Sequence, residues 1–348
     1  MQQGTTVQGH PCQVSARSSR GRRLKLAVVM AAAALGAAAC SGDPAPEPPG
    51  VGAEAPTVLA TTSIWADVVS NLACDGLAEV EAIIPIGSDP HGYEPSLQDT
   101  ERMTNASLIV ANGLTLEGRL EDTLEAVATS GTPVLEFAAE MDPIPYGFDA
   151  GHDEHEGHEE DEGHDDHGHD HGAEDPHVWF DPHRVAEALP VLAQALTADA
   201  GLDPAAVEAC LNSYVAELEA VDAEIAAKVE QLPAESRKLV TNHEALGYYA
   251  ARYGFEMIGT VIPSPSSMAE PNPAGLEMLA ETIEREGIKA IFAEVQHSGD
   301  DIKALAAQVG DVDVVTLYTG SLGPPGSGAE TYTGYLRTNT DLIVDSLN

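Results

Sequence analysis

The sequence predicts an α/β protein of two lobes, and two observations lead to this prediction. Short runs of β-forming residues alternate with amphipathic helical patterns through most of the chain, a rhythm typical of parallel sheets with helices on their faces. One long helical pattern interrupts this alternation, with four strands expected before it and four after it. We therefore expect two (β/α)4 lobes joined by one long rigid α-helix.

The first lobe is expected at residues 57–200. Its strands are expected at 57–61, 80–84, 108–111 and 133–137. Its helical patterns lie at 64–73, 96–104, 117–129 and 183–200.

The second lobe is expected at residues 236–348 and repeats the same rhythm. Its strands are expected at 238–242, 256–261, 290–293 and 312–317. Its helices are expected at 244–253, 273–286, 300–309 and 331–346.

The linking helix is expected at residues 203–233. Asp203 and Pro204 form a favourable N-cap and first-turn pair, apolar residues then recur three or four positions apart, and Pro233 ends the pattern. About 28 residues at a rise of ~1.5 Å span roughly 42 Å, enough to pass both lobes as a strut. The alternative is one arm of a helical hairpin in a single domain, which fits less well with the strands that resume afterwards.

The N-terminus has the features of an export signal. A basic segment at 20–25 precedes a short apolar run at 24–39, which is shorter than the roughly 20 residues of a spanning helix. The small residues before Cys40 resemble a bacterial lipoprotein cleavage site. We expect residues 1–39 to be a lipoprotein-type signal peptide, Cys40 to carry the lipid, and the Pro-rich residues 40–56 to be a tether. The alternatives are an uncleaved anchor or an ordinary secretory cleavage.

Of the other cysteines, Cys12 belongs to the leader, which leaves Cys74 and Cys210. In an oxidising compartment these two can form a disulfide, and two buried free thiols are the equal alternative. No Cys-x-x-Cys spacing points to a thiolate zinc site.

The charge balance restricts the partners. The chain has 57 acidic and 16 basic residues and a formal net charge of −41. Nucleic-acid binding requires clustered Lys and Arg to neutralise phosphates, so we expect no nucleic-acid partner. This charge suits the binding of cations.

A histidine-rich acidic tract at 149–174 has too few apolar residues and too much like charge to fold. We expect it to be a disordered loop of the first lobe. Seven histidines set among its carboxylates suit divalent metals, and flexible ligands of this kind make weak, fast sites that capture or sense metal. These auxiliary metal-binding residues are His152, His155, His158, His164, His167, His169 and His171. The alternative is a solvated acidic loop with incidental histidines.

Three other histidines are candidates for a specific metal site. His91 and His243 each follow an expected strand, in loops where parallel-sheet proteins place functional residues. His177 begins the ordered segment after the tract, in Asp-Pro-His-x-Trp-Phe-Asp-Pro at 175–182. A lone histidine is more often structural, but the joint placement of these three favours a shared site.

Four motifs give the chain a specific resemblance over residues 57–347. They are Pro-x-Gly-x-Asp-Pro-His-x-Tyr-Glu-Pro at 85–95, the 175–182 segment, Thr-Asn-His-Glu-Ala-x-Gly-Tyr-Tyr at 241–249 and Ile-Phe-Ala-Glu-x-Gln at 291–296. In these motifs the chain resembles the zinc and manganese solute-binding proteins of bacterial ABC importers, the cluster A-I or ZnuA/TroA-like family, and specifically its zinc type with a histidine-rich loop. The resemblance implies two (β/α)4 lobes, a rigid linking helix and one metal in the interlobe cleft.

Carried over to this sequence, the resemblance implies that His91, His177 and His243 are the metal ligands. Manganese-type relatives carry a carboxylate at the position of His243, so a third imidazole favours zinc. Many relatives offer an Asp where this chain has Gly320, so the fourth ligand is expected to be water, Glu294 or Glu270. His297, one residue past the last motif, is a weaker candidate for a place near the cleft.

The function expected from these features is that of a high-affinity zinc receptor outside the cytoplasm. We expect a monomer, lipid-anchored to the outer face of the cell membrane, that delivers Zn²⁺ to an ABC importer permease. One tight cleft site and additional weak loop sites are expected. The alternatives are a manganese-specific protein of the same family and a surface metal buffer or adhesin. A zinc hydrolase also uses three histidines and water, but the sequence has no His-Glu-x-x-His run, so we expect no enzyme.

Overall fold

The two expected sheets are present in a computed structural model, which describes residues 55–147, 174–297 and 299–348. These residues belong to one unit at 53–348. The expected signal peptide, Cys40 and the seven tract histidines lie outside the described residues. The proposed boundaries of the leader and the tether therefore stay predictions.

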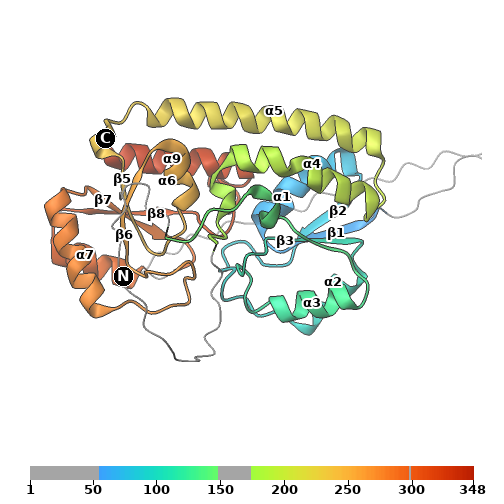
Figure 1. Ribbon diagram of the computed structural model, residues 1–348, viewed down its shortest axis with the longest axis horizontal. Helices are drawn as coiled ribbons and strands as arrows, with labels where there is room; N and C mark the ends of the chain where they lie inside the picture. The colour runs from blue at the N-terminus through green and yellow to red at the C-terminus, as the bar shows by residue number, and fades with distance from the viewer. Residues whose placement is uncertain (1–54, 148–173, 298) are drawn as a thin grey trace, which may run out of the picture. The chain divides into compact units, whose positions relative to one another are not determined.

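Each lobe contains a parallel sheet of four strands, which confirms the predicted fold class (Figure 1). In the first sheet the order is β2-β1-β3-β4, built from β1 (Thr57–Ala60), β2 (Glu79–Ala82), β3 (Leu108–Ala111) and β4 (Val134–Glu136). In the second the order is β6-β5-β7-β8, built from β5 (Lys238–Thr241), β6 (Glu256–Thr260), β7 (Ala290–Glu294) and β8 (Asp313–Leu317). The two orders are the same once the second set is renumbered from its own first strand. In each sheet, the strand order changes side between the first and third strands of the lobe. Parallel sheets bind ligands at such switch points.

The helices follow the strands along the chain. The first lobe contains α1 (Ser63–Leu72), α2 (Leu97–Asn105), α3 (Glu121–Thr129) and α4 (Pro182–Ala198). The long helix is α5 (Pro204–Val229), and the second lobe contains α6 (Gly247–Tyr253), α7 (Pro273–Glu286), α8 (Asp300–Val309) and α9 (Tyr332–Leu347). None of the helices in the described ranges is long and apolar enough to cross a membrane.

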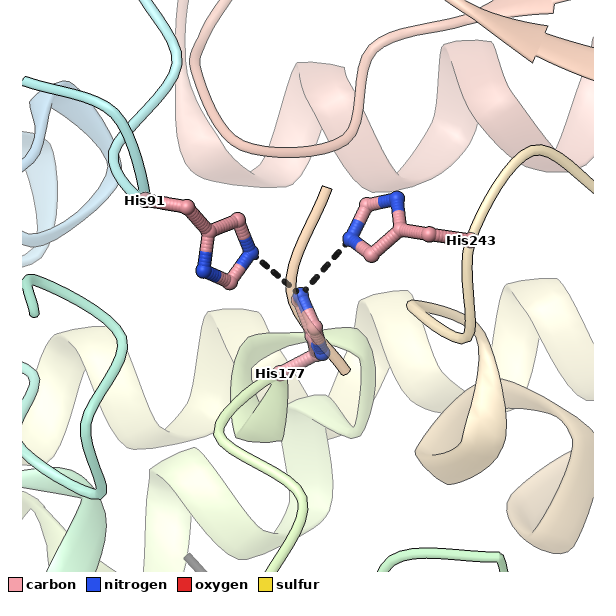
Figure 2. Close-up of side chains that lie close together, drawn as sticks. All are labelled: His91, His177 and His243. Carbon is pink, nitrogen blue, oxygen red and sulfur yellow. Dashed lines mark hydrogen bonds between the residues drawn. The ribbon is translucent and has the colours of Figure 1, made fainter. Parts of the chain in front are cut away.

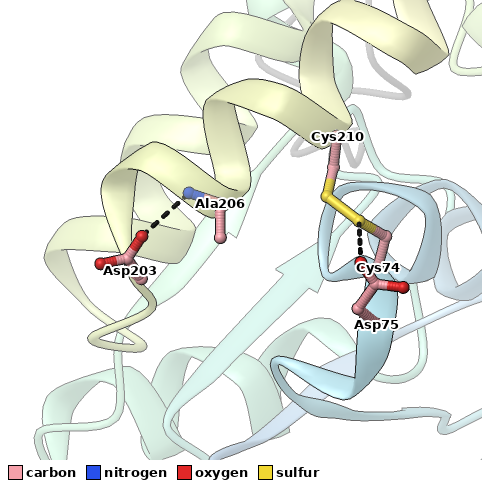
Figure 3. The surroundings of a disulfide bond; sticks show 5 residues. All are labelled: Cys74, Asp75, Asp203, Ala206 and Cys210. Carbon is pink, nitrogen blue, oxygen red and sulfur yellow. Dashed lines mark hydrogen bonds between the residues drawn. A yellow bond between two sulfur atoms is a disulfide. The ribbon is translucent and has the colours of Figure 1, made fainter.

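Side-chain caps fix where several of these helices begin. The Asp203 carboxylate accepts a hydrogen bond from the Ala206 backbone N–H at 2.9 Å and so starts α5 (Figure 3). Asp181 caps α4 in the same way through the backbone N–H of His183. Both helices have proline at their first position, where its missing N–H costs no hydrogen bond.

Buried apolar side chains form three clusters that explain the layering. Each sheet has its own outer cluster, which includes Ile109 and Leu124 in the first lobe and Ile291 and Leu305 in the second. The third and largest cluster contains residues of both lobes together with the apolar stripe of α5. The α/β layers of both lobes therefore share one continuous core along α5.

Helix α5 contacts α1 and α4 of the first lobe and α9 of the second. A disulfide joins Cys210 of α5 to Cys74, just after α1, with the two Cα atoms 6.1 Å apart (Figure 3). On the second-lobe side, ion pairs connect α5 to α9: Lys228 with Asp341, and Arg337 Nε with Glu224 Oε2 at 2.8 Å. Its contacts with both lobes support the proposal that α5 links them.

Two helices begin later than their sequence patterns predicted. We expected one helix to start at residue 117, but α3 starts at Glu121. The Glu117 side chain instead accepts hydrogen bonds from the backbone N–H groups of Asn112 (2.8 Å) and Gly113 (3.1 Å), so it shapes the turn after β3. Similarly, we expected a helix from residue 244, but α6 starts at Gly247, because residues 243–246 form the turn that presents His243.

Candidate metal site

His91 lies in the loop between β2 and α2. The Asp89 carboxylate accepts a hydrogen bond from the His91 backbone N–H at 3.0 Å. The other oxygen of Asp89 accepts a hydrogen bond from Ser267 Oγ of the second lobe at 2.6 Å. One aspartate thus orients the loop of His91 and contacts the opposite lobe.

His177 lies just before a short 3-10 turn at Val178–Phe180. Its Nδ1 is 2.8 Å from Asp175 Oδ1, and the same oxygen accepts a hydrogen bond from the His177 backbone N–H at 2.9 Å. The segment is held from the second lobe as well, because Tyr248 Oη of α6 donates to the Asp175 carbonyl at 2.7 Å. With Nδ1 facing a carboxylate, the ring presents Nε2 to the interlobe space.

His243 follows β5, and its Nδ1 contacts Glu294 Oε1 at the end of β7. The same oxygen accepts a hydrogen bond from the His243 backbone N–H at 3.3 Å, and Glu294 Oε2 accepts one from Thr319 Oγ1 at 2.8 Å. Because β5 and β7 are the strands between which the second sheet changes direction, this pair lies where parallel sheets bind ligands.

The three imidazoles converge on one point (Figure 2). His177 Nε2 is 3.3 Å from His91 Nε2 and 3.2 Å from His243 Nε2. Each residue offers one ligand atom within 4.8 Å of the other two, and in the described ranges this is the only such group of three or more His, Cys, Asp or Glu. Three ring nitrogens face one another, and Nδ1 of His177 and of His243 each contacts a carboxylate. This arrangement is typical of metal sites, because such carboxylates fix the tautomer and orient the ring.

All three histidines are buried, with exposed fractions of 7%, 1% and 3% for His91, His177 and His243. Burial, followed by the other histidines, lowers the pKa of His91 well below its usual range. Burial would also lower the pKa of His243, but the neighbouring Glu294 carboxylate outweighs it and raises that pKa. Burial acts to raise the pKa of Glu294, and the His243 ring overcomes it, holding that pKa at about 2. The lowered pKa of Glu294 favours a carboxylate in its charged form behind His243.

The space between the three histidines is a small cavity of about 10 Å³. Its lining includes the three histidines, Pro90 and Gly320. A Cβ atom added to Gly320 would lie 2.7 Å from Pro90 Cδ, closer than real contacts allow. Glycine at this position therefore permits the close approach of the loop after β8 to the loop that carries His91.

The two carboxylate candidates for the fourth ligand differ in position, since Glu294 lines the cavity and Glu270 does not. Both oxygens of Glu294 are engaged, with His243 and with Thr319, so it would have to give up a contact to bind the ion directly. Glu270 is exposed and does not line the cavity. Of the three expected alternatives, only water has no such geometric obstacle.

Sequence reasoning missed Asn112, which follows β3. It is fully buried, donates from Nδ2 to the Pro176 carbonyl at 3.0 Å, and accepts at Oδ1 from Trp65 Nε1 at 2.9 Å. It therefore holds the backbone next to His177. Its position directly after a buried parallel strand was an available signal.

Comparison with known proteins shows which family this chain resembles. A family model described as ZnuA, zinc-uptake complex component A periplasmic, matches residues 58–346. The zinc-binding protein TroA of Treponema pallidum is 30% identical over 300 residues, 84% of this chain and 89% of that protein. The manganese-binding lipoprotein MntA of Halalkalibacterium halodurans is 28% identical over 295 residues, 84% of this chain and 88% of that protein. The solved structure of periplasmic TroA from T. pallidum has a TM-score of 0.72 and 27% identity, covering 84% of this chain and 99% of the other.

Proposed function

Because this chain belongs to the ZnuA/TroA family of metal-binding solute-binding proteins of ABC importers, we propose that its cargo is Zn²⁺, which it binds outside the cytoplasm and delivers to an importer. The observation that carries this proposal is the convergence of three buried imidazole nitrogens on one cavity. The names of the relatives alone do not choose the metal, since they include both zinc and manganese proteins.

The spacing of the nitrogens supports zinc. Four-coordinate zinc holds nitrogens at ~2.0–2.1 Å, which puts any two of them roughly 3.3–3.4 Å apart. The two Nε2 distances from His177 are 3.2 and 3.3 Å, and the ligand atoms of all three residues lie within 4.8 Å of one another. Two of the three separations therefore match a tetrahedral ion.

The chemistry of the ligands disfavours manganese. Manganese prefers oxygen ligands and more of them than zinc. Two carboxylates line the cavity, and both are already engaged: Glu294 contacts His243 and Thr319, and Asp89 accepts from the His91 backbone N–H and from Ser267. The site thus offers three nitrogens, and its carboxylate oxygens have other partners.

The extracytoplasmic location rests on the sequence and on the relatives. Residues 1–39 have the pattern of a lipoprotein signal peptide ending at Cys40, and several relatives are named lipoproteins of metal importers. We infer that a lipid on Cys40 anchors a monomeric receptor at the outer face of the membrane. The partner is then the permease of an ABC importer.

The histidine-rich tract supplies the second part of the proposal. The described residues that flank it are paired, since Pro145 and Glu174 form an antiparallel bridge three residues before His177. Metal collected by the seven tract histidines would therefore be held close in the chain to a ligand of the buried site. The tract acts as a weak collector and the buried site as the tight one.

Competition calorimetry on the metal-stripped protein tests this assignment. Zinc should bind at one tight site and at several weaker ones, and manganese should bind far more weakly at the tight site. Deleting residues 152–171 should remove only the weaker sites, whereas His243→Ala should remove the tight one. His183→Ala is the matched control, because this histidine lies at the surface beside Glu187.

A surface metal buffer is the second candidate, and the tract favours it. If the tract deletion abolished all tight binding while His243→Ala left it intact, the buffer would replace the receptor. Tighter binding of manganese than of zinc would reject the metal assignment and keep the receptor role.

A further inference from the structure

His297 is a fourth imidazole beside the three converging histidines. It lies three residues after the end of β7, in the loop that follows Glu294. Its ring centroid is 6.5 Å from that of His243, with the planes inclined by 72°. The corresponding separations among His91, His177 and His243 are 5.0–5.4 Å. His297 is thus next to His243, but it does not line the cavity and must move to reach it.

The Nε2 atom of His297 is buried and has no hydrogen-bond partner in the described structure. Buried polar atoms almost always have such a partner, so an exception calls for an explanation. The ring as a whole is not locked in the core, because 24% of its side chain is exposed. Because no hydrogen bond holds Nε2 and part of the side chain is exposed, the His297 ring is free to rotate.

The neighbouring carboxylates do not anchor this ring. His297 Nε2 is 3.8 Å from Asp89 Oδ2 and 4.0 Å from Glu294 Oε2, both longer than a hydrogen bond. Each of these oxygens already accepts a shorter hydrogen bond, from Ser267 Oγ at 2.6 Å and from Thr319 Oγ1 at 2.8 Å. The backbone N–H of His297 donates to the Glu294 carbonyl at 3.3 Å, whereas its Nε2 lies between carboxylates of the two lobes with no hydrogen bond to either.

The buried site lacks one protein ligand. Three imidazoles leave one position of a tetrahedral ion open, and Gly320, which lines the cavity, has no side chain to offer. A side chain there would collide with Pro90, so residue 320 cannot supply the ligand while the loops are closed.

We propose that His297 is the fourth ligand of the loaded site. This inference rests on the proposed zinc function. On loading, the ring moves toward His243, its neutral Nε2 forms a bond to the ion, and a water molecule bound to the ion leaves. The resulting shell of four nitrogens, two of them from the second lobe, contains no exchangeable water and fits manganese even less than three nitrogens do.

X-ray absorption at the zinc edge tests the proposal, with one equivalent of zinc bound to the full chain. The seven tract histidines are replaced by asparagine in every sample, so that only the buried site contributes imidazole scattering. The parent should show four imidazoles, whereas His297→Ala should show three imidazoles and one oxygen. His297→Gln keeps a polar side chain of similar length and should resemble the alanine variant. His183→Ala should leave four.

Affinity gives a second readout. Loss of a supporting partner of a metal ligand costs roughly 10- to 100-fold in affinity, and His297→Ala should weaken zinc binding by at least that much. Thermal unfolding of the metal-free variants checks that they fold. Three imidazoles and one oxygen in the parent, or unchanged scattering in His297→Ala, would overturn the role of His297. Absence of tight zinc binding in the parent, or tight binding retained in His243→Ala, would instead overturn the proposed function.

Discussion

The two lobes have the same strand order but secure the metal site by different means. The residue directly after β3 is Asn112, and the last residue of β7 is Glu294; both are buried. Asn112 is neutral and holds the backbone beside His177, whereas Glu294 is charged and holds the ring of His243 itself. Each lobe also places a carboxylate behind a histidine, Asp175 behind His177 and Glu294 behind His243. The difference is that the residue at the end of the central strand holds backbone in the first lobe and a histidine ring in the second.

The attachment of α5 shows the same contrast. A covalent bond between Cys74 and Cys210 ties it to the first lobe. The ion pairs that tie it to α9 are partly exposed, with side-chain exposures of 31% and 57% for Lys228 and Asp341. Removing contacts in the first lobe should thus affect stability most, and removing charges in the second should affect metal binding most.

Loss of the disulfide should give the largest change in stability. The bond closes a long loop, with 136 residues separating its two cysteines, and such bonds typically contribute about 2–4 kcal/mol. Replacing both cysteines by serine should lower the free energy of unfolding by this amount in a denaturant titration. Zinc affinity should change little, and a large loss of affinity would show that α5 also positions the ligands.

Glu294→Gln should give the largest change in affinity short of removing a ligand. The amide keeps the shape of the side chain but removes the negative charge behind His243. Supporting partners of this kind contribute roughly 10- to 100-fold in metal affinity. Zinc titration should detect this loss with little change in the unfolding of the metal-free protein. Equal affinity in both proteins would mean that Glu294 only orients the ring.

Asn112→Ala should have the opposite profile. It leaves the buried Trp65 Nε1 and the Pro176 carbonyl without their partner, at a cost of roughly 1–3 kcal/mol for such groups. Thermal unfolding should therefore show a clear destabilisation, with a smaller effect on zinc affinity than Glu294→Gln. A larger effect on zinc affinity than on stability would show that Asn112, like Glu294, acts mainly on the metal site.

Acidification should weaken zinc binding through His243 before His91. Glu294 raises the pKa of His243, whereas burial lowers that of His91. Metal binding requires neutral imidazoles, so proton competition at His243 begins while the pH is still above ~6.5. Removing the carboxylate with Glu294→Gln should shift this onset to lower pH. Affinity measured between about pH 8 and pH 5 tests this shift, and identical profiles in the two proteins would contradict it.

The smallest effect is expected from Lys228→Met. This change breaks the exposed pair with Asp341, and such pairs contribute at most about 1 kcal/mol. The unfolding free energy should fall by less than it does on loss of the disulfide, and the difference from wild type should shrink at high salt. A loss as large as that of the disulfide would mean that α5 depends equally on both lobes.

The fold could be predicted from the sequence because its signals are local. Each of the eight strands was expected within a residue or two of its observed position, since β-rich runs bounded by turns need no tertiary information. The starts of α3 and α6 could not be predicted, because they depend on the turn made by Glu117 and on the loop that presents His243. Glu117 bonds back to the backbone of Asn112 and Gly113, and the loop of His243 is held by Glu294 at the end of β7. A helical pattern reveals neither contact.

For the candidate metal site, sequence reasoning predicted that the three histidines lie together but did not predict their surroundings. Loop position and motifs pointed to His91, His177 and His243, which the structure brings together. Glu294 was expected as a candidate ligand, yet it faces Thr319 and the far side of His243. Which side of a ligand a carboxylate occupies depends on how β5 and β7 are aligned, and this alignment is not encoded in any single motif.

The cavity of about 10 Å³ also governs kinetics. A space of this size holds roughly one water molecule, so an aqueous ion must shed nearly all of its hydration shell to enter. Pro90 and Gly320 both line this cavity, so we expect a change in the spacing of their two loops to alter the release rate. Two variants of equal affinity can then differ in the residence time of the ion. A membrane partner that separates Pro90 from Gly320 would unload the protein rapidly without altering a single ligand.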